Sequence, residues 1–262
     1  MQNRYAGDVG DFGKLGLLRC LSTNSDGGGA LRLGIVWYLV PDELRGNDGK
    51  HIGYLKRTAK NERRFRSCDA ELYDALVRIV STDRSVSNIE SAGVLPADTC
   101  YFNDELALSE FRTFGSSWAR TSARQKWLSR SLECVKDCDL LFLDPDNGLE
   151  VPSVEIHHQR APKYVFFEEL KTFASLDGLK TLIVYQHLCR NGCAAEQIDG
   201  RTQEIKDQLG DERAVLPVVY RRGTQRVFFI ISFSAQQEEL LRSRVKKMLR
   251  EPWSRHFSLQ EV

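Results

Sequence analysis

The sequence lacks long apolar runs and any imbalance of charge. No stretch approaches the roughly 20 apolar residues of a membrane helix, and the first residues lack the apolar core of a signal peptide. We therefore expect a cytoplasmic protein without a membrane partner. Lysine and arginine total 37 against 36 aspartates and glutamates, a formal net charge of +1. No overall field attracts nucleic acid, so a nucleic-acid surface must be a local basic patch.

The cysteines lack the spacing of a disulfide framework or a standard zinc knuckle. Seven is an odd number, and free thiols are expected in a reducing compartment. Zinc stays a minor alternative, through Cys189 and Cys193 with His187, or through Cys134 and Cys138. His187 is equally well explained as a core or helix-capping histidine, and cysteines are commonly buried without a ligand.

Disorder and internal repetition are also absent. Hydrophobic residues make up 42% of the 262 residues, which is enough for a sizeable core. No repeat is visible along the chain. The sequence predicts one α/β domain over residues 1–262.

An acidic, turn-forming segment follows the most apolar stretch of the chain. Leu140–Leu143 is apolar on both faces and predicts a central strand of a parallel sheet. The next residues are Asp144-Pro145-Asp146-Asn147-Gly148-Leu149-Glu150. Ligands of open α/β sheets bind beyond the carboxyl ends of such strands, and clustered carboxylates are costly unless a positive group binds them. A plain turn is the alternative; we favour a ligand site.

Further strands are predicted around this one. Buried strands over 33–40 and 181–187 end near Asp42 and near Tyr185 and His187, and a short strand over 98–104 ends at Asp104. Helices are expected over 109–134, 168–173 and 236–250. Residues 215–220 and 226–233 predict an antiparallel hairpin. A mainly parallel sheet that ends in such a hairpin is the Rossmann-like arrangement of class I methyltransferases.

Residues 53–95 predict a polar, helical insert. Its basic residues cluster in one run, Lys56, Arg57, Lys60, Arg63, Arg64 and Arg66. This run is a candidate phosphate-binding patch. A solvated helix face is the common alternative.

Glycine is frequent near the N-terminus. It recurs at every third position, at Gly7, Gly10, Gly13 and Gly16. This segment is too glycine-rich to begin a stable helix, which we expect to start near Leu15. The backbone here is suited to approach a ligand closely, together with Asp8, Asp11 and Lys14. A flexible terminus is the alternative.

Several of these residues resemble one enzyme family. Ala6-Gly7, Asp11 and Lys14 fit an Ala-Gly-x-x-x-Asp-x-x-Lys pattern, and Asp144-Pro145 falls where that family has Asp-Pro-Pro-Tyr. An aromatic residue, Tyr185, ends the next strand, and residues 214–223 are similar to the family's C-terminal hairpin. In these features the chain resembles the large-subunit ribosomal RNA adenine methyltransferases that carry a helical insert.

The resemblance implies S-adenosylmethionine as cofactor and a nucleic-acid adenine as acceptor. Asp144 and the Pro145 carbonyl would accept hydrogen bonds from the exocyclic amine of an adenine turned out of its stack. As a hypothesis, we take Asp144, Pro145, Asp146, Asn147 and Lys14 as the catalytic set. The candidate cofactor contacts are Asp8, Asp11, Asp42, Asp104, Tyr185 and His187. Asp146 and Asn147 replace the family's second proline and its aromatic residue, and the loop after the first strand lacks the family's glycines.

These differences favour two alternatives. The first is a Mg²⁺-dependent nuclease or phosphodiesterase that uses Asp144, Asp146, Glu150, Glu169 and Lys171. Its Pro-Asp…Glu-x-Lys pattern requires residues 169–171 to form a strand, whereas we predict a helix there. The second is a non-catalytic binding module with a methyltransferase fold.

Overall fold

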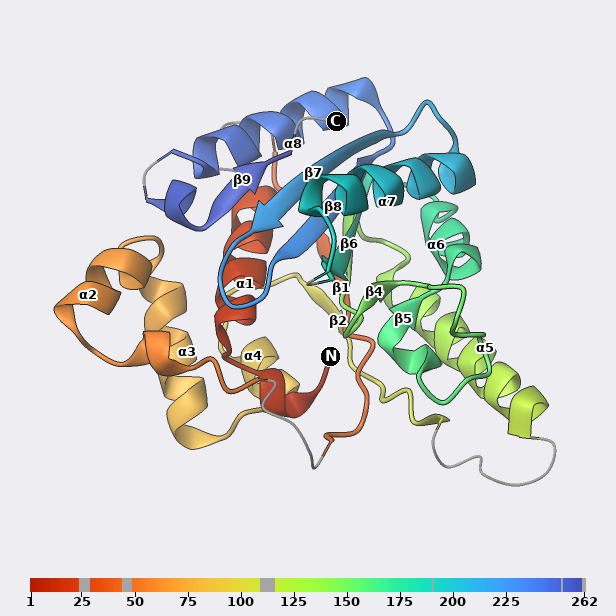
Figure 1. The fold of residues 1–262 in the computed structure, drawn as a ribbon, viewed down its shortest axis with the longest axis horizontal. Helices are drawn as coiled ribbons and strands as arrows, with labels where there is room; N and C mark the ends of the chain where they lie inside the picture. The colour runs from red at the N-terminus through yellow and green to blue at the C-terminus, as the bar shows by residue number, and fades with distance from the viewer. Residues whose placement is uncertain (24–28, 44–48, 109–115, 190, 251, 261–262) are drawn as a thin grey trace.

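A seven-stranded sheet forms the centre of the protein in the computed structural model, which describes residues 1–23, 29–43, 49–108, 116–189, 191–250 and 252–260. The strand order is β2-β1-β3-β6-β8-β7-β9. The strands are β1 (Leu33–Val36), β2 (Cys100–Phe102), β3 (Leu140–Leu143), β6 (Thr181–His187), β7 (Ala214–Tyr220), β8 (Arg226–Ser232) and β9 (Phe257–Leu259). The strands β2, β1, β3 and β6 pair in parallel, and β8 is antiparallel to both of its neighbours. The predicted mostly parallel, Rossmann-like α/β sheet and its C-terminal hairpin are confirmed (Figure 1).

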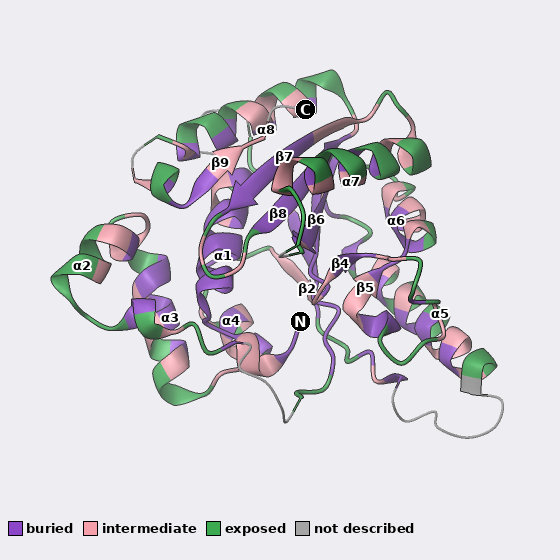
Figure 2. Cartoon of the chain, viewed as in Figure 1, coloured by how far each residue is buried: buried purple, intermediate pink, exposed green. Residues whose placement is uncertain are grey.

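Helices cover both faces of the sheet because successive side chains of each strand point to opposite sides. Ile35, Phe142 and Ile183 belong to one buried cluster, and their neighbours Val36 and Leu141 belong to the other. The first face carries α1 (Val9–Ser22), α3 (Ala70–Thr82), α4 (Val86–Ser91) and α8 (Ala235–Met248). The second face carries α5 (Ser116–Val135), α6 (Phe167–Ala174) and α7 (Ala194–Leu209). Figure 2 shows buried strands beneath helices whose outer surfaces are exposed.

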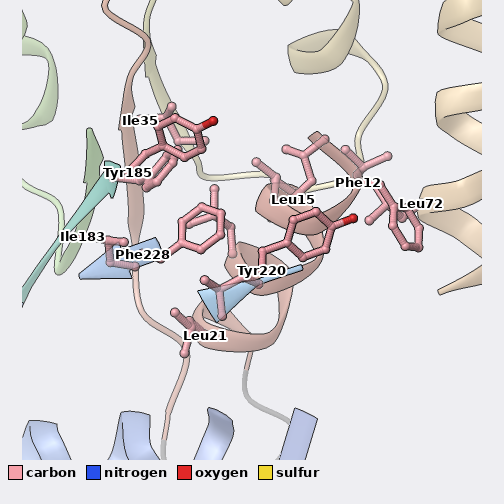
Figure 3. Packing of buried hydrophobic residues seen from close by; sticks show 14 of the residues in the cluster. Phe12, Leu15, Leu21, Ile35, Leu72, Ile183, Tyr185, Tyr220 and Phe228 are labelled. Atoms are coloured by element: carbon pink, nitrogen blue, oxygen red, sulfur yellow. The ribbon is translucent and has the colours of Figure 1, made fainter. Parts of the chain in front are cut away.

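The helical insert lies between β1 and β2 in the sequence. It contains a 3₁₀ turn (Gly53–Leu55), α2 (Ala59–Asn61), a π-helical turn (Glu62–Arg66), α3 and α4. Its buried side chains, including Phe65 and Leu72, join the same cluster as Phe12 of α1. Figure 3 shows Leu72 next to Phe12. The insert therefore extends the main core beside α1.

Short elements complete the described chain. Three further 3₁₀ turns span Asn3–Tyr5, Ala161–Lys163 and Trp253–Arg255, and β4 (Gly148–Leu149) pairs in parallel with β5 (Tyr164–Val165). Among the described residues, no helix is both long and apolar enough to cross a bilayer.

The structure corrects the predicted end of one strand. The strand predicted over 33–40 ends at Val36, and Tyr38 takes a left-handed conformation with φ of 45°. Beyond that point the chain bonds to the N-terminal segment and to the chain after β2, through Val40 N–H to Met1 O and Leu106 N–H to Leu39 O. The helix predicted over 109–134 is described from Ser116; residues 109–115 lie outside the described residues.

The expectation that the glycine-rich segment cannot begin a helix is wrong. Helix α1 starts at Val9, where the Asp8 side chain accepts hydrogen bonds from the backbone of Gly10 and Asp11. The glycines lie where the helix meets bulky side chains. A Cβ on Gly13 would lie 2.5 Å from the Tyr220 ring, and one on Gly16 would lie 2.4 Å from Trp253. Close packing thus offsets the low helix propensity of glycine.

Alanine at these glycines therefore tests the packing of α1. We expect Gly13→Ala and Gly16→Ala to lower the free energy of unfolding by about 1–3 kcal/mol, because the added methyl groups clash with buried rings. Gly200→Ala is the control, since no atom lies within 4 Å of its added Cβ in helix α7. It should stabilise by up to about 1 kcal/mol. Urea denaturation measures the free energy of unfolding of all three variants. A higher value for Gly13→Ala and Gly16→Ala than for the unchanged protein would contradict the close packing of α1.

Candidate functional site

A pocket of about 310 Å³ lies at the edge where β3 and β6 end and where the β7–β8 hairpin turns. Nine of the eleven residues predicted for the site line it: Asp8, Asp11, Lys14, Asp144, Pro145, Asp146, Asn147, Tyr185 and His187. Segments more than 100 residues apart in the sequence therefore meet at one edge of the sheet, as expected for an open α/β fold.

Strand alternation explains why these side chains meet α1. Ile183 and Phe228 point toward the α1 face, so the residues two positions closer to the pocket, Tyr185 and Arg226, point the same way. Asp144 follows Leu143, which faces the opposite side, and it also reaches the α1 face. Helix α1 presents Asp8, Asp11 and Lys14 at a spacing of three residues, which places them on neighbouring turns of one helix face.

Lys14 is a buried residue of the pocket lining. Its Nζ donates to Asp144 Oδ2 at 2.6 Å and to Asp11 Oδ1 at 2.9 Å. The same ammonium lies 5.5 Å from the centre of the Trp37 ring and 5.6 Å from that of Tyr185. Burial alone disfavours the charged amine, but the two carboxylates raise the pKa of Lys14 well above its usual value. Lys14 therefore stays protonated and binds both carboxylates.

The carboxylates around Lys14 differ in how many hydrogen bonds they accept. Both Asp11 oxygens are engaged, because Oδ2 also accepts from Gly7 N–H at 2.9 Å. Asp144 accepts only at Oδ2, and no described residue donates to its Oδ1. Burial raises the pKa of Asp144 and Lys14 opposes that shift. Asp144 thus lines the pocket with one unused acceptor.

Asp146 and Asn147 form the wall beside Asp144. The Asp146 carboxylate contacts the Met1 amino group at 3.2 Å and accepts from Gln2 Nε2 at 2.9 Å. Burial opposes its ionisation, but the Met1 amino group, Gln2 and Lys163 together lower the pKa of Asp146. The Asn147 carbonyl accepts from His187 N–H at 3.0 Å. These contacts tie the loop after β3 to the N-terminal segment and to β6.

A hydrogen-bonded chain in the pocket lining joins Arg226, Tyr185 and His187. Arg226 Nε donates to the Tyr185 hydroxyl at 2.9 Å, and that hydroxyl lies 2.8 Å from His187 Nε2. The other ring nitrogen, His187 Nδ1, lies 3.4 Å from Thr224 Oγ1, and the tautomer of the ring decides which group donates in each contact. Burial and the Arg226 charge lower the pKa of His187 to about 4. His187 is therefore neutral at pH 7.

The structure places the other two predicted residues outside the pocket. Asp42 is exposed and accepts from Arg4 N–H at 3.1 Å. Asp104 is exposed and bonds to Arg130 Nε at 2.8 Å. The loops after β1 and β2 therefore contribute neither acid to the pocket.

The residues of the nuclease and zinc alternatives are not gathered at one site. Glu169 lies on helix α6 and binds Arg124, and Lys171 binds the exposed Glu168. The Glu150 side chain accepts from Phe167 N–H. Within the described residues, no group of three or more histidine, cysteine, aspartate or glutamate side chains is arranged to hold a metal ion. All cysteines among the described residues are free thiols.

Two cationic lining residues, Arg226 and Lys163, were missed from the sequence. A signal was present for Arg226, which is a charged residue at the start of the apolar run 227–231 and directly after a turn. Lys163 enters through the small β4–β5 sheet, whose position depends on tertiary contacts.

The predicted basic run divides into two parts. Arg57 and Arg66 form ion pairs with Asp74, at 3.6 and 2.8 Å, and support the insert. Arg64 instead lies near Arg222 of the hairpin turn. Burial and the Arg64 charge lower the pKa of Arg222, and His256 bridges Arg222 Nε and the Arg64 carbonyl.

The sequence matches no protein-family model and no curated protein.

Removal of the Lys14 charge tests the buried cluster. We expect Lys14→Met to lower the free energy of unfolding by about 3–5 kcal/mol, because it leaves two carboxylates buried without a cation. Adding Asp144→Asn should restore part of this loss. The control, Lys171→Met, breaks an exposed pair with Glu168 and should cost less than about 1 kcal/mol. The measurement is urea denaturation. Equal losses of unfolding free energy for Lys14→Met and Lys171→Met would contradict the claim that the buried carboxylates depend on the Lys14 charge.

The protonation of His187 is a second test. In NMR titrations its ring signals should change with a midpoint near pH 4 and stay those of a neutral imidazole at pH 6. Arg226→Gln should raise this midpoint, because the substitution removes a nearby positive charge. A midpoint near the ordinary histidine value of about 6.5 would show that the ring is solvated or has a different partner.

Proposed function

We propose that the protein is an S-adenosylmethionine-dependent methyltransferase that acts on the exocyclic amine of a nucleic-acid base. The contact between Lys14 and Asp144 carries this proposal. It joins the N-terminal Ala-Gly-x-x-x-Asp-x-x-Lys pattern to the Asp-Pro pair after β3, which lie 130 residues apart. The sequence resemblance rested on these two patterns together with Tyr185 and the C-terminal hairpin, and in the fold the two patterns meet at one site.

The order of the strands supports the same proposal. Strand β8 lies between β6 and β7 and runs antiparallel to both. An antiparallel strand at the C-terminal end of an otherwise mainly parallel sheet is the arrangement of class I methyltransferases. Fold alone does not assign chemistry. The strand order therefore supports only the methyltransferase class of fold, and the support for methyl transfer comes from the pocket.

The pocket has a size and polarity suited to the cofactor. Its volume of about 310 Å³ lies at the lower end of the range for small-molecule sites. Its lining includes the carboxylates of Asp8, Asp11, Asp144 and Asp146 and the cations of Lys14, Lys163 and Arg226. Charged groups of both signs suit the amino acid end and the sulfonium of S-adenosylmethionine, which supplies the methyl group when bound. Because Asp42 and Asp104 face elsewhere, the cofactor would be held by the start of α1 and the ends of β3 and β6.

The chain's own groups have defined roles in this proposal. Asp144 Oδ1 and the Pro145 carbonyl have no hydrogen-bond donor among the described residues and would accept the amine protons of the base. Lys14 fixes the Asp144 carboxylate through Oδ2. Hydrogen bonds from the amine to both acceptors would hold its nitrogen in place and increase its electron density.

Arginines near the pocket would bind the nucleic-acid backbone. Arg63 and Arg221 are exposed, and Arg64 and Arg222 are half-buried between the insert and the hairpin turn. The same turn contributes Thr224 to the pocket. Phosphates bound by these arginines would lie beside the pocket that receives the base.

Substitution of Asp144 tests the proposal directly. Asp144→Ala should retain the fold and lower methyl transfer at least about a hundredfold, because the amine loses a positioned acceptor. Asp207→Ala, on the exposed face of α7, is the control and should transfer normally. The measurement is incorporation of labelled methyl groups into RNA and DNA oligonucleotides with unpaired bases, followed by nucleoside analysis.

Two results would contradict the proposal. The first is undiminished transfer by Asp144→Ala. The second is cofactor binding without transfer to any RNA or DNA acceptor, which would instead support the binding module.

A further inference from the structure

Two opposite charges in the pocket lining lie within ion-pair distance without a direct hydrogen bond. Arg226 Nη2 lies 3.9 Å from Asp8 Oδ2. Both side chains are almost fully buried, with exposed fractions of 5% for Arg226 and 7% for Asp8. A buried ion pair usually closes to hydrogen-bonding distance, because each charge has lost its water. The separation therefore needs an explanation.

The other polar atoms of both side chains are already engaged. Arg226 Nε donates to Tyr185, and Nη1 donates to the carbonyls of Arg222 at 2.7 Å and Thr224 at 3.0 Å. Asp8 Oδ1 accepts from the backbone N–H groups of Gly10 and Asp11. Of the polar atoms in these two side chains, only Arg226 Nη2 and Asp8 Oδ2 have no hydrogen-bond partner among the described residues. Both side chains line the pocket, so each offers it one unused charged atom.

Neither charge can move toward the other without loss of these contacts. Asp8 is held as the N-cap of α1, and Arg226 is the first residue of β8. Both side chains pack directly against Gly10, where a Cβ would lie 2.9 Å from Nη2 and 2.8 Å from Asp8 Oδ1. Only glycine therefore fits beside both charges.

We propose that Asp8 and Arg226 form a subsite for a zwitterionic α-amino acid group, with the ammonium on Asp8 Oδ2 and the carboxylate on Arg226 Nη2. A ligand with only a negative charge would be repelled by Asp8, and one with only a positive charge would be repelled by Arg226. A group that carries both charges on adjacent atoms satisfies both partners through charge-assisted hydrogen bonds.

The identity of this amino acid group rests on the proposed function. For a methyltransferase it is the methionyl end of S-adenosylmethionine, which places the sulfonium further along the pocket, on the side of Asp144. The subsite itself depends only on the two charges. Binding of a free amino acid therefore tests it separately from methyl transfer.

The first experiment needs no substitution. Calorimetric titration of the full chain compares S-adenosylhomocysteine with its decarboxylated analogue, and L-methionine with 3-(methylthio)propylamine and 4-(methylthio)butanoate. Each analogue that lacks one charge should bind about tenfold or more weakly than its parent, because one charged hydrogen bond is lost. Equal affinities of parent and analogue, or no binding of either parent, would overturn the subsite.

Substitutions then assign each charge to its residue. Asp8→Asn keeps an N-capping oxygen and should abolish the preference for ligands that carry the amino group. Arg226→Gln should abolish the preference for those that carry the carboxylate. Asp207→Asn and Arg130→Gln change exposed residues outside the pocket and should leave both preferences intact. Unchanged preferences in both pocket variants would overturn the assignment.

The outcomes separate this inference from the proposed function. Selective binding of L-methionine without methyl transfer to any nucleic acid keeps the subsite and rejects the methyltransferase. Methyl transfer without discrimination between the parent ligands and their analogues keeps the methyltransferase and rejects the subsite.

Discussion

The buried ammonium of Lys14 is the constraint on which the site depends. An isolated charge inside a protein is strongly unfavourable, and Lys14 is 4% exposed. It is stable there only because Asp11 and Asp144 both bind it. This requirement fixes the start of α1 against the end of β3, and so it brings together the two halves of the pocket.

The rest of the N-terminal helix is adapted to that position. The helix can lie this close to the hairpin and to the C-terminal segment because glycines face Tyr220, Trp253 and Arg226. Asp8 both begins the helix and supplies a charge to the pocket. Stability and function are therefore coupled in one segment: its glycines are unfavourable for an isolated helix, but they allow the approach that builds the site.

Much of this arrangement could be predicted from the sequence. Apolar runs and turn residues identified the sheet and the hairpin, and polar residues after two strands and in the N-terminal glycine-rich segment identified nine residues of the pocket lining. The helical start of α1 could not be predicted, because its stability comes from Tyr220 and Trp253, more than 200 residues away. Asp42 and Asp104 were assigned on the general rule that acids at strand ends bind ligands. Whether such an acid faces the pocket depends on the path of its loop and on partners such as Arg130, which local patterns do not reveal.

The most direct test is a crystal structure of the protein with S-adenosylhomocysteine, the unreactive product of the cofactor. The account predicts ligand density between the N-terminal turn of α1 and the ends of β3 and β6, with Asp144 and Lys14 in its wall. Density in the crevice beyond β1 and β2, beside Asp42 and Asp104, would show that the cofactor site has been misplaced. Absence of ligand density at saturating concentration would contradict the methyltransferase assignment itself.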